Sequence, residues 1–330
     1  MKQASKQIVA VTLNPCLDTA FFVDGLNVGQ SNQVLRVERD AGGNGINVSR
    51  VVRKLGGRAI ATGFLGGGIG AHLVAILDNE SVCHDFIHIK GETRVSIMIE
   101  PGDGSPTVLA GLGPFVKTID VVALMDELEL LLPDSGWLTL GGSLPPGLQA
   151  DVYASLVPLG RKHGCKVLLD ADVPSMSYGM DALPDLIKPN VSEAERLLGR
   201  TIGSQKEKIE AAKELRDEMK GRSGLLSTIY EPTVIISDGE RNAVMACAEG
   251  IYLGEPPKVN ARSTIGSGDS MLGAFVWESI MGKSNAECFQ WGLAAGAATA
   301  TTNGAEICSR SMILQLLEGA HVSHCHPVNA

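Results

Sequence analysis

The sequence predicts an α/β fold in which helices cover both faces of a mostly parallel β-sheet. Short runs rich in β-branched residues alternate with glycine-bearing turns and amphipathic helical segments along most of the 330 residues. Two stretches, 20–37 and 93–109, instead alternate apolar and polar residues without an intervening helix. We therefore expect one large sheet and, outside it, a small antiparallel β-sheet that forms a lid or a dimer contact.

The predicted elements follow one another in the order strand, turn, helix. The first strand, Ile8–Leu13, is a short and mainly apolar run. The first helix, 45–55, has apolar residues near helical spacing and is stopped by Gly56 and Gly57. The same reasoning predicts strands at 59–65, 137–140, 166–170, 186–188 and 233–237, and helices at 71–79, 151–163, 192–198, 269–281 and 285–301.

Length and composition favour a single domain that spans residues 1–330. No Pro/Ser-rich or charge-rich linker divides the chain, and 44% hydrophobic residues allow a sizeable core. The net charge of −9 argues against a nucleic-acid partner, which usually meets a basic face. A phosphorylated ligand remains compatible with this charge, because a few cations or helix N-termini can hold an anion.

The cysteines and the N-terminus indicate the compartment. The seven cysteines are scattered, odd in number and never arranged as Cys-x-x-Cys, which is typical of a reducing environment. The apolar run near the N-terminus is too short for a signal peptide, and no run approaches the roughly 20 residues that cross a bilayer. We therefore expect a cytoplasmic protein with no membrane partner.

The strongest candidate for chemistry is segment 262–270, which opens into an apolar helix. Gly266 and Gly268 let the backbone turn sharply, so the free N–H groups of the first helical turn, next to Ser267, converge as phosphate oxygens require. Asp269 beside them can take the proton of an attacking hydroxyl during phosphoryl transfer. A plain helix cap with a tight glycine turn explains the segment equally well.

A second glycine-rich segment, 40–48, also enters a helix. Gly42 and Gly43 allow a ligand to approach the backbone, and Asn47 can bind sugar hydroxyls. A glycine turn without a ligand is the alternative. Asp18, just past the first strand, can hold two sugar hydroxyls, although such an aspartate is more often a turn residue.

Three further segments have both a functional and a structural interpretation. Asn190 and Glu193 have the spacing of a helix capping box, which is the stronger interpretation from spacing alone. The same pair can order Mg²⁺, which needs only one or two protein carboxylates. The loop 141–147, which contains Ser143, is either a ligand loop or a rigid turn. The glycines at 66–71 fit a loose dinucleotide pattern, but no strand-end acid follows at the right distance.

Together and in this order, the segments resemble the ribokinase-like carbohydrate kinases of the phosphofructokinase-B family, over about residues 8–310. The family's late motif, [D/S]-T-x-G-[A/S]-G-D, matches 263–269, and its early motif, G-G-x-G-x-N, matches 42–47. The resemblance implies a ribokinase-like three-layer α/β/α fold with a small β lid. Segments 12–18, 89–94 and 142–147 are similar to the branch that phosphorylates ketohexose monophosphates, which includes 1-phosphofructokinase, tagatose-6-phosphate kinase and the minor bacterial 6-phosphofructokinase.

The resemblance also implies a role for each motif residue. An ATP-dependent kinase is expected, with Mg²⁺ as cofactor, a small sugar phosphate as substrate and a homodimer formed through the lid. Its base would be Asp269, with an ordinary carboxylate pKa, and its anion hole Gly266, Ser267 and Gly268. The implied binding residues are Asp18, Gly42, Gly43 and Asn47 for the sugar, Arg94 and Ser143 for its phosphate, Asn190 and Glu193 for Mg²⁺, and Lys188, Asn190, Ser237 and Gly239 for the nucleotide.

The chain departs from the branch at a few positions. Asn44 stands where many members have Lys, Gln33 stands near a common Arg, and Arg241 stands where relatives usually have Gly. The loss of two cations, at Asn44 and Gln33, motivates one alternative, a kinase of an unphosphorylated sugar or nucleoside. A second alternative is a sugar-phosphate sensor without turnover, against which the intact Asp269 and Glu193 argue. The sequence leaves open which ketohexose phosphate is used, whether K⁺ is needed and whether ATP regulates the enzyme.

Overall fold

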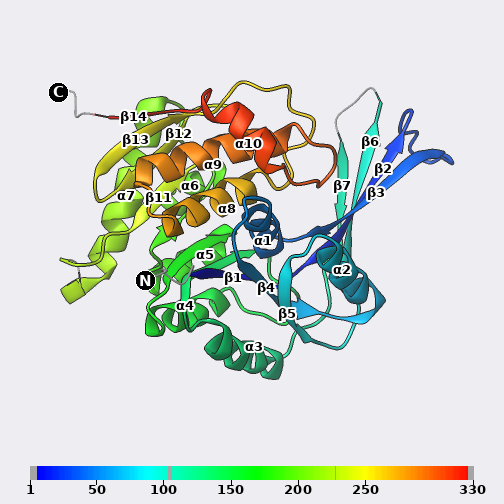
Figure 1. The fold of residues 1–330 in the computed structure, drawn as a ribbon, viewed down its shortest axis with the longest axis horizontal. Helices are drawn as coiled ribbons and strands as arrows, with labels where there is room; N and C mark the ends of the chain where they lie inside the picture. The colour runs from blue at the N-terminus through cyan, green and yellow to red at the C-terminus, as the bar shows by residue number, and fades with distance from the viewer. Residues whose placement is uncertain (1–5, 103–105, 227, 326–330) are drawn as a thin grey trace.

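The computed structural model describes residues 6–102, 106–226 and 228–325, which form two β-sheets and the helices packed on them (Figure 1). The large sheet has ten strands in the order β14-β13-β12-β11-β10-β9-β8-β1-β4-β5. Neighbouring strands from β5 to β11 are parallel, and β12, β13 and β14 add an antiparallel edge. The bounds of these strands are β1 Gln7–Thr12, β4 Ala59–Leu65, β5 Cys83–His88, β8 Ser135–Gly142, β9 Lys166–Ala171, β10 Leu186–Ile187, β11 Thr233–Ile236, β12 Ala243–Cys247, β13 Gly250–Glu255 and β14 His321–His324.

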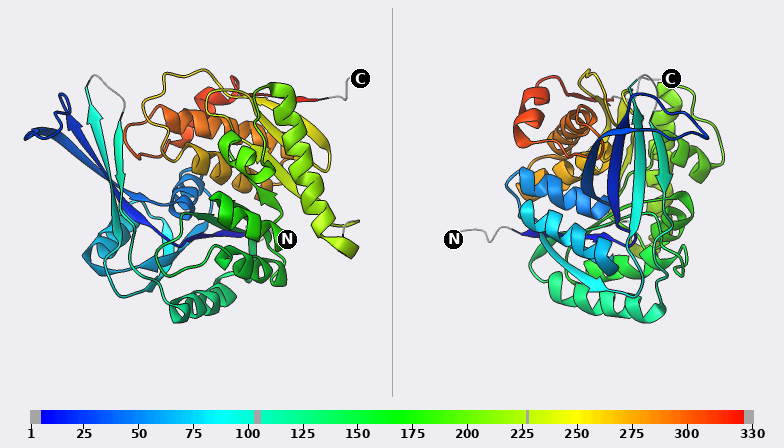
Figure 2. Two further views of the ribbon diagram at one scale, coloured as in Figure 1. Left: turned by 180° about the vertical axis from the view of Figure 1, so that it is seen from behind. Right: turned by 90° about the vertical axis from the view of Figure 1, so that its right-hand side faces the viewer.

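Helices cover both faces of the large sheet, so the molecule has three layers (Figure 2). Strand β1 shows why: Val9 and Val11 enter one hydrophobic core, and Ile8 and Ala10 enter the other. The first core includes residues of α3 (Thr118–Leu131), α4 (Val152–Lys162), α5 (Val173–Asp181), α6 (Val191–Leu198) and α7 (Gln205–Arg222). The second includes residues of α1 (Asn44–Lys54), α8 (Ser267–Ile280), α9 (Asn285–Ala300) and α10 (Arg310–Leu317).

A four-stranded sheet stands beside this body and forms the lid, with the order β3-β2-β6-β7. Its strands are β2 (Cys16–Val23), β3 (Val34–Gly42), β6 (Arg94–Pro101) and β7 (Thr107–Ala110). At its base, residues of β2, β3 and β6 pack with helix α2 (Gly67–Asn79) and strand β4 in a third apolar cluster. We propose that lid and body form one domain, because this cluster makes the base of the lid part of the core.

The predicted fold class is confirmed, and several details are corrected. The lid is not purely antiparallel, because β2 pairs in parallel with β6. Its first two strands also extend beyond the predicted stretch 20–37, because β2 begins at Cys16 and β3 ends at Gly42. Helix α2 begins at Gly67 rather than at 71, because glycines that suggest a turn form its first turn. Part of the lid stretch predicted at 93–109, residues 103–105, lies outside the described residues.

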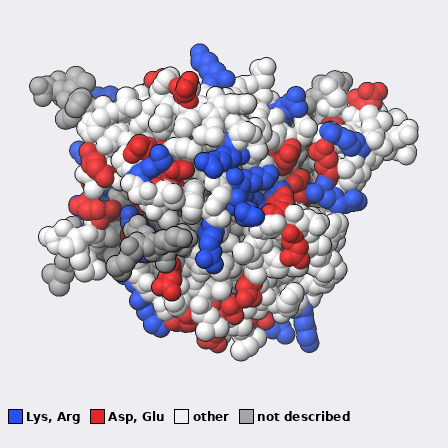
Figure 3. Space-filling model, viewed as in Figure 1, with Lys and Arg blue, Asp and Glu red and all other residues white. Residues whose placement is uncertain are grey.

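On the face drawn in Figure 3, acidic and basic side chains are intermixed. Among the described residues, no helix has the combination of length and apolarity needed to cross a membrane.

Candidate active site

The carboxyl ends of the central strands meet the N-termini of two helices, as expected at this edge of a parallel sheet. Thr12 is the last residue of β1, and its hydroxyl accepts a hydrogen bond from the backbone N–H of Ile46 at 3.0 Å. This bond fixes the start of α1 against the end of β1. Two strands away, β9 carries Asp170 near its carboxyl end. The fold therefore brings the predicted sugar and phosphate loops to one place.

Asp269 lies in the first turn of α8 and is 9% exposed. The helix begins after Gly266, which has φ of 72°, a left-handed conformation that glycine adopts without steric cost. The side chain of Asn47, in α1, donates a hydrogen bond of 2.8 Å to Oδ2 of Asp269. The two motifs that the sequence analysis singled out, 222 positions apart at these residues, thus meet through their polar side chains.

The surroundings of Asp269 favour its protonated form. Burial raises the pKa of Asp269 from its ordinary value of 3.8 to about 7, and the negative charge of Asp170 adds to this effect. The hydrogen bond from Asn47 and the positive charge of Lys188 oppose the rise in pKa. The expectation of an ordinary carboxylate pKa was therefore wrong. A carboxylate with a pKa near 7 is well matched to general base chemistry at neutral pH.

Lys188 is a buried cation next to the start of α8. Its Nζ lies 3.2 Å from Oδ1 of Asp170, and a Cβ placed on Gly268 would be 3.4 Å from the same Nζ. Burial alone would lower the pKa of Lys188, but the charge of Asp170 and, less strongly, those of Glu193 and Asp269 raise it above 10.5. The ammonium group therefore stays charged beside the helix N-terminus, where a transferring phosphoryl group needs a cation.

The predicted sugar residues lie at the base of the lid. Asp18 and Gly42 are on neighbouring strands, and a Cβ on Gly42 would lie 2.0 Å from Oδ2 of Asp18, so any larger residue there would displace the Asp18 carboxylate. Burial raises the pKa of Asp18, although hydrogen bonds from Cys16 and Ser96 oppose the rise. Gly43 is the N-cap of α1. The junction of the lid and α1 thus carries Gly42, Gly43 and Asn47, and Asp18 lies beside it on the neighbouring strand.

Arg94, Asn14 and Ser143 form a separate polar group beside the lid. Two backbone carbonyls hold the guanidinium of Arg94: Nε donates to Asn14 at 3.1 Å, and Nη1 donates to Gly111 at 3.2 Å. Nη2 of Arg94 has no partner among the described residues. The side-chain amide of Asn14 donates to the hydroxyl of Ser143 at 3.3 Å. Asn14 thus contacts both residues that the sequence analysis assigned to the substrate's phosphate, and that assignment stays a prediction.

Asn190 and Glu193 form the predicted capping box at the start of α6. The carboxylate of Glu193 accepts from the N–H of Asn190 at 2.8 Å, and the Asn190 side chain accepts from the N–H of Glu193 at 2.9 Å. Burial raises the pKa of Glu193, the bond from Asn190 opposes this, and the charge of Asp170 adds to it. The pair offers the oxygen atoms that Mg²⁺ prefers, so the donor set fits this ion. The cap holds the carboxylate in a fixed position without excluding a metal.

A cavity of about 440 Å³ opens next to this capping box. It is lined by Asn190, Ser237 and Gly239, three of the residues predicted for the nucleotide, together with Arg241. Backbone hydrogen bonds between 189–191 and Ser237 hold the two walls together, with N···O distances of 3.0 and 3.1 Å. The fourth predicted nucleotide residue, Lys188, does not line this cavity and is placed with Asp170 instead.

Unpaired polar atoms indicate where a ligand is accommodated. Of the eight buried side-chain polar atoms without a hydrogen-bond partner among the described residues, three belong to the segments of the predicted site: Oδ1 of Asn14, Oδ1 of Asn47 and Oγ of Ser267. Buried polar groups are normally paired, and an orphaned group suggests an absent partner such as a ligand or water. The backbone N–H of Ser267 already donates to Thr264 at 3.3 Å. Because the N–H of Ser270 donates to Gly266, the N–H groups of Gly268 and Asp269 are the candidates for the predicted anion hole.

Comparison with known proteins agrees with this geometry. The sequence pattern of the pfkB family carbohydrate kinases matches residues 11–312, which is most of the chain. The chain belongs to this family. It is therefore a carbohydrate kinase, and kinases of this kind transfer phosphate from ATP.

Solved structures extend the comparison. Phosphofructokinase-2 from Escherichia coli, in complex with substrates and products, is 27% identical over 95% of this chain and 98% of its own, with a TM-score of 0.86. A Thermotoga maritima protein named as a possible 1-phosphofructokinase is 24% identical over 97% of this chain and 100% of its own, with a TM-score of 0.84. Ribokinase from Arabidopsis thaliana is 20% identical over 96% of this chain and 99% of its own, with a TM-score of 0.73. The last two likenesses concern the fold alone.

Two polar residues of this carbohydrate kinase, Asp170 and Asn14, were not assigned roles from its sequence. Asp170 pairs with Lys188 and accepts a hydrogen bond of 3.3 Å from the Asn44 side chain. Asn14 connects Arg94 and Ser143. One signal was available: Asp170 ends a predicted buried strand, and strand ends share one edge of a parallel sheet. The order of the strands, which decides which ends are neighbours, is not evident from the sequence.

Proposed function

We propose that this kinase transfers the γ-phosphoryl group of Mg-ATP to a primary hydroxyl of a ketohexose monophosphate, as a 1-phosphofructokinase or a tagatose-6-phosphate kinase does. The observation that carries the chemistry is the contact between Asn47 and Asp269 at the start of α8. It places a buried carboxylate with a raised pKa beside a helix N-terminus and the cation of Lys188. These three features are what transfer of a phosphoryl group to a hydroxyl requires.

In the proposed reaction, Asp269 accepts the proton of the acceptor hydroxyl while the hydroxyl oxygen forms a bond to the γ-phosphorus. The bond between that phosphorus and the β–γ bridging oxygen breaks, and ADP leaves. Asn47 holds the Asp269 carboxylate in position through its 2.8 Å hydrogen bond. The N–H groups of Gly268 and Asp269 and the ammonium of Lys188 stabilise the charge that develops on the phosphoryl oxygens.

The nucleotide is assigned to the cavity lined by Asn190, Ser237 and Gly239. Mg²⁺, when bound, supplies charge neutralisation at the phosphates. Glu193 is its proposed carboxylate ligand, with Asn190 holding that carboxylate through the capping box. The E. coli relative has been solved in complex with potassium. Whether this kinase also needs K⁺ is tested by comparing its activity in K⁺ and Na⁺ buffers.

The choice of a phosphorylated substrate rests on Arg94. Two backbone carbonyls accept from Nε and Nη1 of its guanidinium, and we assign the remaining Nη2 to a phosphate oxygen. Asn14 and Ser143 lie next to it, and Asn14 has a buried oxygen without a partner. An arginine suits phosphate because its planar fork matches phosphate geometry. The E. coli relative has also been solved in complex with fructose-6-phosphate.

The first experiment measures ADP release with Mg-ATP and a panel of acceptors. The panel contains fructose 1-phosphate, fructose 6-phosphate, tagatose 6-phosphate, fructose and ribose. A kcat/KM at least 100-fold higher for one ketohexose phosphate than for fructose and ribose supports the proposal and names the substrate. Activity confined to the unphosphorylated sugars would keep the kinase and replace this proposal by the alternative substrate class.

Substitution of Arg94 tests the phosphate clamp directly. We expect Arg94→Ala to raise the KM for the preferred sugar phosphate by 10- to 100-fold, because a charge-assisted hydrogen bond to phosphate is lost. The kcat should change little. Arg53→Ala is the matched control, since Arg53 is an exposed arginine whose Nε donates to the backbone oxygen of Ser81 at 2.8 Å, away from the proposed site. An unchanged KM in Arg94→Ala would remove Arg94 from the substrate site.

We also propose that two copies of this kinase pair through the outer face of the lid. The E. coli relative has been solved in a tetrameric inhibited form. In this chain, one face of the lid carries exposed apolar side chains on β3 and β7, among them Val37 and Leu109 at 38% and 54% exposure. A cytoplasmic location stays a prediction from the sequence.

A further inference from the structure

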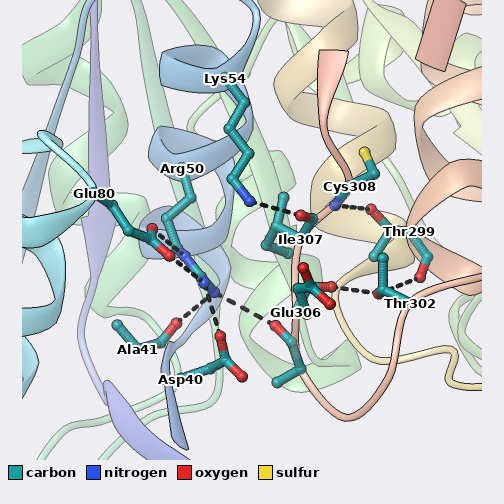
Figure 4. A network of polar contacts seen from close by, with 11 residues as sticks. Asp40, Ala41, Arg50, Lys54, Glu80, Thr299, Thr302, Glu306, Ile307 and Cys308 are labelled. Atoms are coloured by element: carbon teal, nitrogen blue, oxygen red, sulfur yellow. Dashed lines mark hydrogen bonds and ion pairs between the residues drawn. The ribbon is translucent and has the colours of Figure 1, made fainter. Parts of the chain in front are cut away.

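Arg50 in α1 is a fully buried cation outside the groups assigned to chemistry. Its side chain is 1% exposed. All of its nitrogen atoms are engaged: Nε and Nη2 donate to the two oxygens of Glu80 at 2.7 Å each, and Nη2 also donates to Asp40 at 2.9 Å. Nη1 donates to the backbone oxygens of Ala41 at 3.0 Å and Ala305 at 3.4 Å (Figure 4). A guanidinium buried at this depth is costly unless every donor is satisfied.

The partners of Arg50 come from three different parts of the molecule. Asp40 and Ala41 are at the end of lid strand β3, immediately before Gly42 and Gly43. Glu80 follows the last residue of α2. Ala305 belongs to the loop 301–309, which connects α9 to α10. One side chain thus holds the base of the lid, the end of a helix and a distant loop around α1.

The loop 301–309 packs against segment 262–270, which carries the proposed base. Oγ of Ser263, at the start of the phosphate-binding segment, donates to Gly304 at 2.6 Å. Thr299 connects the loop to α8, because its hydroxyl bonds Ser270 at 2.7 Å and accepts from the N–H of Cys308 at 3.3 Å. A Cβ on Gly266 would lie 2.9 Å from Cδ1 of Ile307. A shift of this loop therefore changes the packing of Gly266 and the start of α8.

Helix α1 has a second connection to the same loop and a direct one to the base. Lys54, four residues after Arg50, donates to the backbone oxygen of Ile307 at 2.7 Å (Figure 4). Asn47, three residues before Arg50 and hence near it on the helix surface, donates to Asp269. Arg50 lies between these two contacts, at the level where the lid joins the body.

We propose that Arg50 is a positioning residue that fixes the lid strand β3 relative to the phosphoryl-transfer helix α8. It acts through Asp40 and Ala41 on the lid side and through Ala305 on the helix side. When the lid is correctly placed, Asp18 and Gly42 present the sugar to Asp269, and water is excluded from the phosphoryl group. This inference rests on the proposed sugar site. It adds to that site a coupling between the lid and the transfer helix.

A purely structural role makes a different prediction from a positioning role. Glu80 receives two hydrogen bonds from Arg50, whereas Asp40 receives one. If Arg50 only stabilises the fold, Glu80→Ala is the more damaging variant in every respect. If Arg50 positions the lid, Asp40→Ala is the more damaging variant for the reaction, even where Glu80→Ala unfolds at a lower temperature. Both carboxylates are partly exposed, at 19% and 25%, so truncating them opens no cavity in the apolar core. Each truncation does remove hydrogen bonds from the buried Arg50 and should lower the melting temperature.

The experiment compares Asp40→Ala, Asp40→Asn and Glu80→Ala in the full chain. The readouts are the melting temperature, the KM and kcat for the preferred sugar phosphate, and the ratio of ADP released to sugar phosphorylated. We expect Asp40→Ala to raise KM about tenfold and to raise the ratio clearly above one, because a misplaced lid admits water. Asp40→Asn keeps an oxygen acceptor for Arg50 and should retain the wild-type ratio. Glu80→Ala should retain it too, despite its larger loss of stability.

Three results would overturn the inference. An unchanged ratio and KM in folded Asp40→Ala would leave Arg50 with a structural role alone. Equal defects in Asp40→Asn and Asp40→Ala would show that the charge of Asp40, which faces Asp18 across the two strands, is responsible instead of the contact with Arg50. A wild-type protein that phosphorylates no sugar phosphate would refute the proposed function itself and the coupling with it. The first two results leave the proposed function untouched.

Discussion

The carboxylate of Asp269 is the single group on which the proposed chemistry depends. Its pKa is raised to about 7, first by burial and then by the charge of Asp170. A base acts only when it is deprotonated, so lowering the pH through 7 should progressively remove activity. We expect kcat/KM, which reports the free enzyme, to rise between pH 5 and pH 8 with a midpoint near 7. A flat profile over this range would contradict the assignment of a base with a raised pKa.

Substitution of Asp170 tests the cause of this shift. Asp170→Asn removes a negative charge near Asp269 and releases Lys188 from its ion pair. Both changes favour the ionised form of Asp269, so the midpoint of the profile should move down by about one pH unit or more. The sugar phosphate titrates near pH 6. Its contribution is the same for both proteins and cancels in the comparison. An unmoved midpoint would exclude Asp170 as a cause.

Asp269 itself was predictable from the sequence, whereas its electrostatic setting was not. Local chemistry predicts Asp269, because an aspartate after two glycines at the start of a helix is visible in the segment itself. The same holds for Asn47 and for the capping box. The pairing of Asp170 with Lys188 depends instead on β9 and β10 being neighbours. That neighbourhood is set by the packing of the whole sheet, and no local pattern shows it.

At the scale of elements, the capping box of α6 holds the proposed metal ligand. We expect Glu193→Gln to keep the bond to the N–H of Asn190, because an amide oxygen also accepts. The loss of charge should raise the Mg²⁺ concentration for half-maximal activity by at least tenfold, with little change in melting temperature. Titration of activity with Mg²⁺ measures both the affinity and the maximal rate.

Helix α9 supplies the control for this experiment. It begins with the same kind of capping box, in which Glu287 accepts from the N–H of Ser284 at 3.0 Å. Glu287→Gln should leave the Mg²⁺ requirement unchanged. Equal effects of the two substitutions would show that Glu193 acts only as a cap.

The elements differ in how well the sequence predicted them. Strands β4, β9 and β11 and helices α1, α8 and α9 were predicted within one or two residues, because an apolar periodicity and a glycine or capping residue mark their ends. Helix α7 was missed, since its surface is dominated by charged residues and only a narrow stripe that includes Leu215 and Met219 is buried. The edge strands β12 to β14 were also missed. Their pairing is antiparallel and breaks the strand–helix alternation on which the prediction relied.

At the scale of the whole molecule, the register of the lid separates two faces. Residues directly opposite one another on neighbouring strands point to the same side. Asp18, Asp40 and Ser96 share the side that bears the sugar residues. The other side is mainly apolar, although it also carries Thr19 and Arg39, and at its base Leu17 and Ala41 pack with α2 and β4. Its partly exposed apolar residues are Phe21, Val37, Ile97, Ile99 and Leu109. The alternation in the sequence predicted such a two-faced sheet, but not which residues of each face pack against the body.

The apolar face leads to a prediction about assembly. We expect the wild-type kinase to be a dimer in solution at micromolar concentration, measured by light scattering coupled to size exclusion. Leu109→Asp places a charge in the proposed interface, where desolvation of an unpaired carboxylate costs several kcal/mol. This variant should therefore be a monomer in the same range. Val108 is the control, since it is the adjacent residue of β7, is almost equally exposed and lies on the opposite face.

The two lid variants discriminate between a specific interface and a general effect on the lid. Val108→Asp adds the same charge to the same strand, so a destabilised lid would weaken assembly in both proteins. Dissociation of Leu109→Asp alone supports pairing through the face that contains Phe21 and Val37. A wild-type monomer, or a dimeric Leu109→Asp, would contradict that pairing. A dimer lost only in Val108→Asp would place the interface on the side of the lid that carries Asp18, and the sugar site would then lie at the contact between the two copies.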